Sequence, residues 1–284
     1  MSGTTHEDYR ARQRELWAVG AKAWMRWWAP FEAGADALSQ SIVHAAGVGP
    51  GMRALDLCTG LGEPALRVAR AVGPQGRVVG ADIARAMLEF AAARAREAGL
   101  ANARFVELEG ERLAFAAASF DAATFRWGPM LMDDPLACLR ELRRVLKPGA
   151  RLGVSVWATG KEVPFIAIAG AVAEEVGGIE KPPPDAPGPL RMGRAGVLEQ
   201  ALVDAGFEDV RCEPVEVRMQ FKSAGEYVDF TREVSTTLRR ALEGKGAQVR
   251  DAVWKELGVR AQKYADSSGR VVFVNRAWCA GARA

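Results

Sequence analysis

Residues 53–69, RALDLCTGLGEPALRVA, combine the residue types of a ligand-binding loop. A short apolar run delivers Asp56, and the loop that follows contains Gly60 and Gly62. Glycine permits backbone conformations that let a ligand approach closely, and a helix that begins near Pro64 would direct free amide groups at that ligand. We therefore predict a cofactor site at this strand–loop–helix turn, the alternative being a tight turn without a ligand.

Two classes of cofactor fit this loop. Gly60, Gly62 and Ala65 match the dinucleotide pattern GxGxx(G/A). Asp82 lies 20 residues beyond the second glycine, at the end of the next apolar run, where an acid can bind ribose hydroxyls. The same arrangement suits the adenosine and amino-acid parts of S-adenosylmethionine. Asp56 favours this second class, because its carboxylate would repel a pyrophosphate and attract an ammonium and a sulfonium.

The elements that must position this loop alternate between strands and helices from residue 52 onward. Short apolar runs predict strands, and the segments between them have the apolar spacing of amphipathic helices. Such a βαβα succession predicts an α/β fold with a doubly wound, mostly parallel, Rossmann-like sheet. The predicted strands are residues 54–57, 78–81, 104–108, 122–125 and 152–157, and the predicted helices are 64–72, 84–98 and 135–146.

The flanks of this core predict N-terminal helices and a helical insertion before the last strand. A helix from residue 7 is expected to break at Pro30, before a second helix that runs to Ala46. We predict a single domain over residues 1–284: an N-terminal helical cover (1–50), a cofactor-binding core (51–160) and a C-terminal half of the sheet (161–284) with a helical lid at about 224–265. In this last part we expect helices at 164–176, 195–205, 224–243 and 247–265, and strands at 210–221 and from 271 to 274 or 279.

Four blocks within residues 50–157 together resemble the class I S-adenosylmethionine-dependent methyltransferases, in the group that includes ubiquinone/menaquinone-biosynthesis and small-molecule methyltransferases. The blocks are ALDLCTGLGEPAL, VVGADIARAMLEFA, ELEGERLAF with SFDAATFRW, and LRELRRVLKPGARLGVSVW. The resemblance implies an enzyme that transfers methyl from S-adenosylmethionine to an apolar or aromatic small molecule, at oxygen or carbon.

The resemblance also implies roles for single residues. Asp82 corresponds to the acid that holds the ribose, Ile83 and Met87 to apolar positions beside the adenine, and Glu109 to the acid at the adenine amino group. Cys58 replaces the first loop glycine, so the backbone angles available to glycine are expected to be lost there; we interpret it as a variation and not as a nucleophile. The residues expected to bind the cofactor are Asp56, Thr59, Gly60, Gly62, Asp82, Ile83, Met87, Glu109, Gly110 and Arg126.

The acceptor is expected beside the loop after the fourth strand, residues 126–134. Displacement at a sulfonium needs mainly alignment, and Trp127 and Met130 would form an apolar wall, unless they pack against the neighbouring helix. This loop has no histidine base. Asp133 is a weak candidate, since capping of the helix that begins at Pro135 is the alternative role of this acidic pair. The catalytic residues are therefore unknown.

Four of the eight tryptophans fall within residues 17–28. Trp24, Trp27 and Trp28 either cover the cofactor and bind the acceptor, or hold the N-terminal helices on the sheet. Indole faces also stabilise a nearby cation such as a sulfonium. Both interpretations can hold for different members of this group.

Composition restricts the possible partners. Lysine and arginine total 38 against 35 acidic residues, a formal net charge of +3, which argues against nucleic-acid binding by charge. The longest apolar stretch, residues 165–173, is far shorter than the roughly 20 residues of a membrane span, and the polar N-terminus does not resemble a signal peptide. Four scattered cysteines without a CxxC pair and two histidines predict no metal. We expect a cytoplasmic monomer or homodimer that acts on a small molecule.

Two other functions stay open. An NAD(P)-dependent oxidoreductase on a Rossmann fold would use a similar glycine loop, but Tyr9, Tyr227 and Tyr264 each lack a lysine four residues later. A non-catalytic cofactor-binding or partner protein would keep the fold alone.

Overall fold

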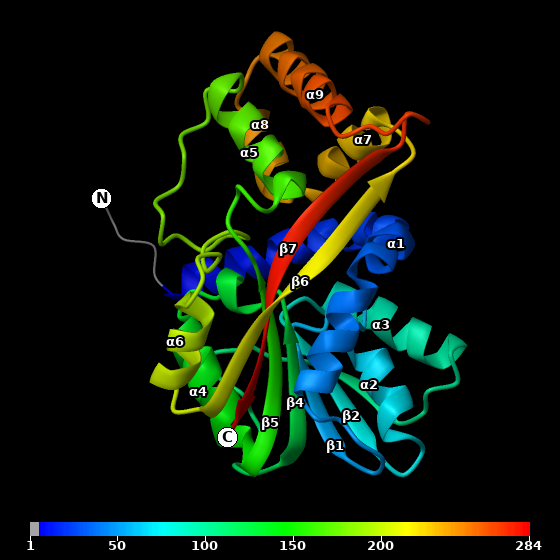
Figure 1. Cartoon of the computed structure of the whole chain (residues 1–284), viewed down its shortest axis with the longest axis vertical. Helices are drawn as coiled ribbons and strands as arrows, with labels where there is room; N and C mark the ends of the chain where they lie inside the picture. The colour runs from blue at the N-terminus through cyan, green and yellow to red at the C-terminus, as the bar shows by residue number, and fades with distance from the viewer. Residues whose placement is uncertain (1–5) are drawn as a thin grey trace.

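In a computed structural model that describes residues 6–284, seven strands form one sheet in the order β3-β2-β1-β4-β5-β7-β6 (Figure 1). The strands β1 to β5 are parallel, and β7 runs antiparallel between β5 and β6. This confirms the predicted doubly wound, mostly parallel sheet. The strands are β1 Arg53–Leu57, β2 Arg77–Asp82, β3 Ala103–Glu107, β4 Phe120–Arg126, β5 Leu146–Trp157, β6 Glu208–Phe221 and β7 Val271–Arg283.

Helices cover both faces of the sheet, with the second half of α1, α2 and α3 on one side and α4 and α6 on the other (Figure 1). The strands β1 and β4 are therefore buried on both faces, which explains their nearly continuous apolar runs. The helices are α1 His6–Ala45, α2 Ala65–Val72, α3 Arg85–Glu97, α4 Pro135–Val145, α5 Pro164–Glu175, α6 Val197–Asp204, α7 Ala224–Val234, α8 Thr236–Glu243 and α9 Ala247–Gln262, with a 3-10 turn η1 at Pro129–Leu131.

The predicted break of the N-terminal helix at Pro30 is wrong. One helix, α1, runs from His6 to Ala45 and contains Pro30. A proline inside a helix costs about 3 kcal/mol, because it lacks an N–H group and crowds the preceding turn. Tertiary contacts on both sides of the proline oppose this cost: Trp27 and Phe31 pack against Phe230 of α7, with ring centroids 5.6 and 6.4 Å away.

The boundaries of three other elements differ from those predicted. The first helix of the insertion divides at Ser235 into α7 and α8, and the last strand extends to Arg283 because it pairs with both β5 and β6. The fifth strand begins at Leu146, earlier than predicted. The helices α5, α7, α8 and α9 gather beyond the carboxyl ends of the parallel strands (Figure 1).

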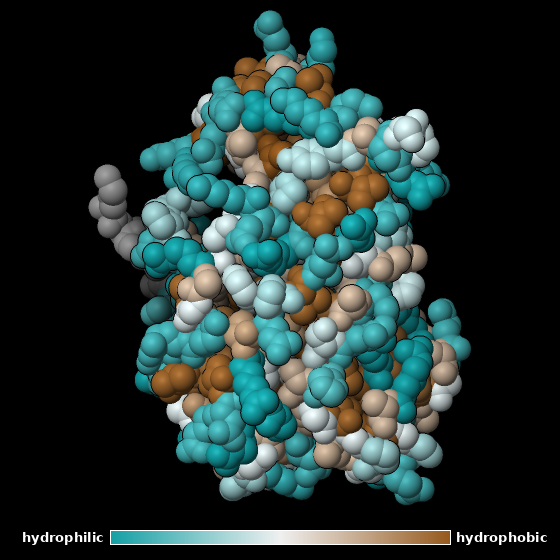
Figure 2. Space-filling view, in the orientation of Figure 1, coloured by the Kyte–Doolittle hydropathy of each residue, from teal (hydrophilic) through white to brown (hydrophobic). Residues whose placement is uncertain are grey.

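The surface is mixed in polarity. On the face shown in Figure 2, apolar side chains are interrupted by hydrophilic ones. None of the helices within residues 6–284 combines the length and the apolarity needed to cross a membrane.

Glycines let the second half of α1 pack directly on strand backbones. A Cβ atom at Gly34 would lie 2.5 Å from the carbonyl oxygen of Arg218 and 2.8 Å from Sδ of Met219, both on β6. On β5, a Cβ atom at Gly153 would lie 2.1 Å from the carbonyl oxygen of Ile42 in α1. This half of α1 is therefore held at a distance that only glycine allows.

We expect Gly34→Ala to lower the free energy of unfolding by about 1–3 kcal/mol, because the added methyl group forces α1 away from β6. Gly20→Ala, in the same helix, is the matched control. Its Cβ would meet Cγ2 of Thr236 at an ordinary 3.4 Å, so removal of a helical glycine should stabilise the chain by up to about 1 kcal/mol. Urea unfolding of both variants checks the prediction, and equal effects would contradict it.

Candidate active site

The predicted cofactor residues meet at the carboxyl ends of four parallel strands. Asp56 lies in β1, Asp82 ends β2, Glu109 follows β3 and Arg126 ends β4. The strand order reverses at β1, which has β2 on one side and β4 on the other. Doubly wound proteins bind ligands in the crevice at this point, since the loops that leave the two strands diverge there. The fold therefore brings residues from distant parts of the sequence to one edge.

The loop after β1 keeps the backbone of a glycine loop although its first glycine is replaced. Cys58 has φ 54°, so the expectation that this position loses glycine's backbone angles is wrong. Gly60 and Gly62 have φ 51° and 96°. The N–H of Thr59 donates to the carbonyl of Ala81 at 3.0 Å, and this bond from the loop to β2 holds the strained residue in place. Burial raises the pKa of the Cys58 thiol well above its ordinary value, as expected of a residue that is not a nucleophile.

Asp56 is fully buried, and the chain itself uses both of its carboxylate oxygens. Oδ1 accepts a hydrogen bond from Oγ1 of Thr124 in β4 at 2.6 Å, and Oδ2 accepts one from the N–H of Ala65 at the start of α2 at 3.0 Å. Burial raises the pKa of Asp56 from 3.8 to about 7, although these bonds favour the charged form. Asp56 therefore joins β1, β4 and α2, and its contact with a cofactor stays a prediction.

Asp82 holds the glycine loop against β2. Its Oδ2 accepts from the N–H of Gly60 at 2.8 Å, and its Oδ1 accepts from the N–H of Ala84 at 3.0 Å. Burial raises the pKa of Asp82. Beside it, Met87 packs in a small apolar cluster with Leu61, and Ile83 adjoins the same cluster. The predicted ribose and adenine residues are thus neighbours.

The predicted adenine acid, Glu109, is paired with α1. Nη2 of Arg14 donates to Oε1 of Glu109 at 3.0 Å, and Nε of Arg10 lies 3.2 Å from its Oε2. A Cβ atom at Gly110 would lie 3.2 Å from Sγ of Cys138, so a small residue is needed there. The first half of α1 therefore reaches across the loops that follow the parallel strands.

Arg126 lies in a buried polar cluster that the sequence did not reveal. Its Nη1 donates to Oε1 of Glu32 and to Oγ of Ser39, both at 2.7 Å. On the loop side, Nη2 of Arg94 donates to Oε1 of Glu63 at 3.0 Å. A usable signal was present, since Glu32 and Ser39 interrupt the buried stripe of α1 at helical spacing.

These residues fit a cofactor that has a cationic amino-acid end. Within the described chain, Oε2 of Glu32 and Oε2 of Glu63 are buried without a hydrogen-bond partner. A buried carboxylate oxygen without a partner is costly, and a bound ammonium would satisfy it. S-adenosylmethionine carries such a group, whereas a pyrophosphate would be repelled.

The N-terminal tryptophans divide between two places. Trp27 is buried against α7, where its Nε1 donates to Glu233 at 2.8 Å, as expected if it holds the helices together. Trp28 adjoins the apolar cluster of Leu61 and Met87, next to the predicted adenine residues. Trp24 contacts both places, since it adjoins this cluster and its ring lies 6.1 Å from that of Phe230. A role in covering the site is therefore better supported for Trp28 than for Trp27.

Trp127 directly follows β4 and has the unusual φ of 53°. Its ring stacks on Trp157 at a centroid distance of 4.3 Å and meets Phe31 of α1 at 5.5 Å. Met130 is buried in the same core. Trp127, which we predicted to form part of the apolar wall of the acceptor site, therefore contacts two other aromatic rings.

The two aspartates of this loop have different contacts. Asp134 caps α4 by accepting from the N–H of Ala137 at 2.9 Å, and Asp133 pairs with His6 of α1. A role of Asp133 as a base stays a prediction. Among residues 6–284, no group of three or more His, Cys, Asp or Glu side chains could hold a metal ion.

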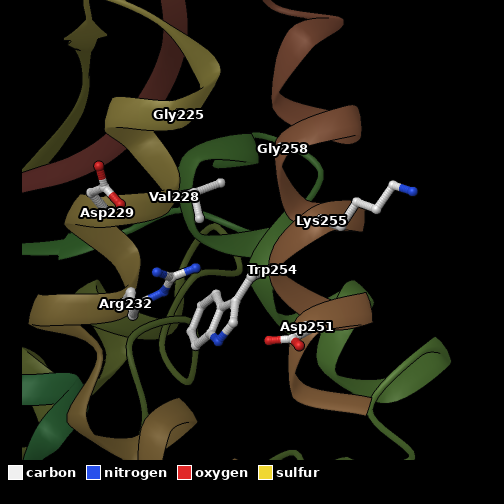
Figure 3. A pocket seen from close by; sticks show the side chains of 8 residues that line it. All are labelled: Gly225, Val228, Asp229, Arg232, Asp251, Trp254, Lys255 and Gly258. Atoms are coloured by element: carbon white, nitrogen blue, oxygen red, sulfur yellow. The ribbon is translucent and has the colours of Figure 1, made fainter. Parts of the chain in front are cut away.

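A separate groove of about 380 Å³ lies between α7 and α9 (Figure 3). The guanidinium of Arg232 points toward the ring of Trp254, 5.1 Å from its centroid, while Lys255 points away from the groove. The residues that line this groove include none of the predicted cofactor residues. It is therefore not the site at the strand ends.

Comparison with known proteins identifies relatives over the core. A model of the ubiE/COQ5 methyltransferase family matches residues 36–166. The chain is similar to the ubiquinone/menaquinone biosynthesis C-methyltransferase UbiE of Shewanella frigidimarina, with 33% identity over 178 residues that cover 59% of this chain and 71% of that protein. It is also similar to the demethylmenaquinone methyltransferase of Lactococcus lactis, with 39% identity over 102 residues, or 36% of this chain and 40% of that protein.

The similarity to solved structures is broader but weaker. The structure of the cyclase SpnF is 25% identical and has a TM-score of 0.55, with 88% of this chain and 80% of that chain covered. By contrast, the chain spans only 40% to 46% of the length of several curated relatives that it matches.

The raised pKa of Asp56 predicts a specific pH dependence of stability. The folded chain keeps this proton up to about pH 7, whereas the unfolded chain loses it near its ordinary value of 3.8. The free energy of unfolding must therefore fall as the pH rises through this interval. Between pH 5 and pH 8, we expect the wild type to lose about 2 kcal/mol more than Asp56→Asn, which cannot titrate.

Urea unfolding at the two pH values measures this difference. Asp204→Asn, on the exposed side of α6, should keep the pH dependence of the wild type. Equal pH dependence of the wild type and Asp56→Asn would show that Asp56 is already ionised at pH 5.

Proposed function

The chain belongs to the ubiE/COQ5 methyltransferase family, and we propose that it transfers the methyl group of S-adenosylmethionine to an apolar or aromatic small molecule, at oxygen or carbon. The resemblance to S-adenosylmethionine-dependent methyltransferases that the four sequence blocks predicted is thereby confirmed. The alternative of an NAD(P)-dependent oxidoreductase is not favoured.

One observation carries the proposed acceptor class: a continuous set of aromatic rings starts at the end of β4. Trp127 stacks on Trp157, and Trp157 adjoins Phe165 of α5 at a centroid distance of 6.4 Å. Phe165 in turn lies 5.6 Å from Phe230 of α7 and 6.1 Å from Phe221 of β6. Aromatic side chains at the end of β4, beside the predicted cofactor site, favour an apolar or aromatic acceptor over a charged one.

Two polar side chains of this region are engaged in the structure of the protein. The hydroxyl of Tyr227 donates to the carbonyl of Phe165 at 2.7 Å, and Arg126 is paired with Glu32. This supports a mechanism in which the chain binds and orients the acceptor and excludes water, without a dedicated base. When bound, S-adenosylmethionine supplies the activated methyl group.

The proposal also includes the cellular compartment, the oligomeric state and the partners of the protein. We propose a cytoplasmic enzyme that acts on a small molecule as a monomer or homodimer. The formal charge of +3 argues against nucleic-acid binding, and the free state of Cys58, Cys138, Cys212 and Cys279 fits a reducing compartment. The UbiE relative acts in ubiquinone/menaquinone biosynthesis according to its name, and a quinone precursor is one acceptor of the proposed class.

The experiment that tests the function is methyl transfer from labelled S-adenosylmethionine to a panel of phenols, naphthols and hydroquinones. The comparison with the cyclase SpnF makes this assay necessary, because one fold can support different reactions. Transfer of label to an aromatic acceptor would support the proposal. Calorimetry in which NADH binds tightly and S-adenosylhomocysteine does not would contradict it.

We expect Asp82→Ala to weaken S-adenosylhomocysteine binding by about 1–3 kcal/mol, because the variant loses a charged hydrogen-bond acceptor and releases the N–H of Gly60. Calorimetry measures the dissociation constant. Asp204→Ala, far from the loop, is the matched control and should bind like the wild type. An unchanged dissociation constant for Asp82→Ala would refute its role.

We expect Trp127→Ala to reduce kcat/KM for an aromatic acceptor by about tenfold or more, because the variant loses the wall of the acceptor site. Its affinity for S-adenosylhomocysteine should stay within about twofold of the wild type. Trp27→Ala is the comparison: it should lower the unfolding midpoint, since Trp27 packs on Phe230 and bonds Glu233. Equal loss of acceptor turnover and cofactor affinity in Trp127→Ala would contradict a role in acceptor binding.

A further inference from the structure

Two buried acidic side chains lie beside the two strands at which the strand order reverses: Glu32 bonds Arg126 at the end of β4, and Glu63 is in the loop after β1. Glu32 comes from α1 and is 8% exposed, and Glu63 comes from the loop between β1 and α2 and is also 8% exposed. Each bonds an arginine through Oε1, Glu32 with Arg126 and Glu63 with Arg94. Each keeps a buried Oε2 atom that has no hydrogen-bond partner in the described part of the chain.

The neighbouring arginines are committed elsewhere and do not satisfy these two oxygens. Arg94 also donates to the carbonyl of Leu61 and lies over the ring of Trp28, 3.7 Å from its centroid. Arg126 also donates to Ser39. Burial and the charge of Glu32 raise the pKa of Glu63, whereas Arg94 and Arg126 act in the opposite direction, so the two acids and the two arginines form one cluster of charges. A positively charged donor placed between the two acids would satisfy both unpaired oxygens.

Asp56 is less accessible to a positively charged ligand group than the two glutamates are. It is completely buried, and its two oxygens accept from Thr124 and from the N–H of Ala65. Withdrawal of either bond would loosen the connection of β1 with β4 or with α2. Within residues 6–284, the carboxylate oxygens at this edge that have no hydrogen-bond partner are Oε2 of Glu32 and Oε2 of Glu63.

We propose that Oε2 of Glu32 and Oε2 of Glu63 bind the α-ammonium group of the cofactor, so that the cation is recognised by α1 and the loop and not by Asp56. This inference rests on the proposed function, because it assumes that S-adenosylmethionine is the ligand. It makes α1 a part of the cofactor site as well as its cover. The amino-acid end of the cofactor then binds across two elements, whereas the adenosine end binds the core at Asp82 and Met87.

Two ligands separate this role from a structural one. S-adenosylhomocysteine has the ammonium group, and 5′-methylthioadenosine has the same adenosine and thioether but lacks the amino-acid end. Calorimetry on the full chain gives the dissociation constants of both ligands for the wild type, Glu63→Gln and Glu32→Gln. We expect each variant to bind S-adenosylhomocysteine about tenfold or more weakly and methylthioadenosine within about twofold of the wild type.

The matched control is Glu175→Gln on α5, an exposed glutamate that pairs with Arg260, and both affinities should stay unchanged. Circular dichroism reports whether each variant folds. Glu32 and Glu63 lie on different elements, so either variant tests the proposal if the other does not fold.

The outcomes are distinguishable. Equal weakening of both ligands, or no weakening of S-adenosylhomocysteine, would overturn the ammonium site while leaving the proposed function in place. A loss confined to S-adenosylhomocysteine in Asp56→Asn, with both glutamate variants like the wild type, would return the role to Asp56. Failure of the wild type to bind either ligand would overturn the proposed function, and the ammonium site with it.

Discussion

The buried carboxylate of Asp56 joins β1, β4 and α2 at the reversal of strand order, where the candidate site lies. Its two oxygens connect β1 to Thr124 of β4 and to the first amide of α2. The glycine loop lies between these attachments, so its path is determined at both ends. Burial raises the pKa of Asp56, although its two hydrogen bonds and the charge of Arg126 act in the opposite direction. These bonds connect the two strands at which the strand order reverses and the helix that follows the loop.

The helix α1 extends this constraint to the rest of the molecule. Its second half packs on strand backbones at positions where only glycine fits, such as Gly34. Its first half crosses the strand ends and is held there by ion pairs of Arg10 and Arg14 with Glu109. One long helix therefore contributes to the core, to the cover of the site and, through Glu32, to the buried polar cluster beside the loop. Its continuity through Pro30 follows from aromatic contacts that a sequence pattern does not contain.

Much of the fold could be predicted because its signals are local. The alternation of apolar runs and amphipathic segments, with glycines at the turns, predicted the sheet and each of its strands, although β5 begins earlier and β7 ends later than predicted. Where prediction failed, a distant contact decided the structure. Phe230 of α7 stabilises the helix around Pro30, and Ala81 of β2 holds the loop in which Cys58 has a positive φ. Glu32 was missed because its partner, Arg126, lies 94 residues away in the sequence.

By itself, the sequence determined the strand–loop–helix that contains Asp56, Gly60 and Gly62, and the acid at Asp82, because all of these depend on spacing within one βαβ unit. The class of cofactor followed from the resemblance of the four blocks and not from this spacing, which fits two classes. The tertiary structure alone decided which carboxylate oxygens are already used and which remain unsatisfied. It paired those of Asp56 with the Thr124 hydroxyl and the N–H of Ala65, and left one oxygen each on Glu32 and Glu63 without a partner. The physical reason is that hydrogen-bond capacity is shared through space. Whether a buried acid can bind a ligand depends on whether groups distant in the sequence already form hydrogen bonds with it in the folded chain.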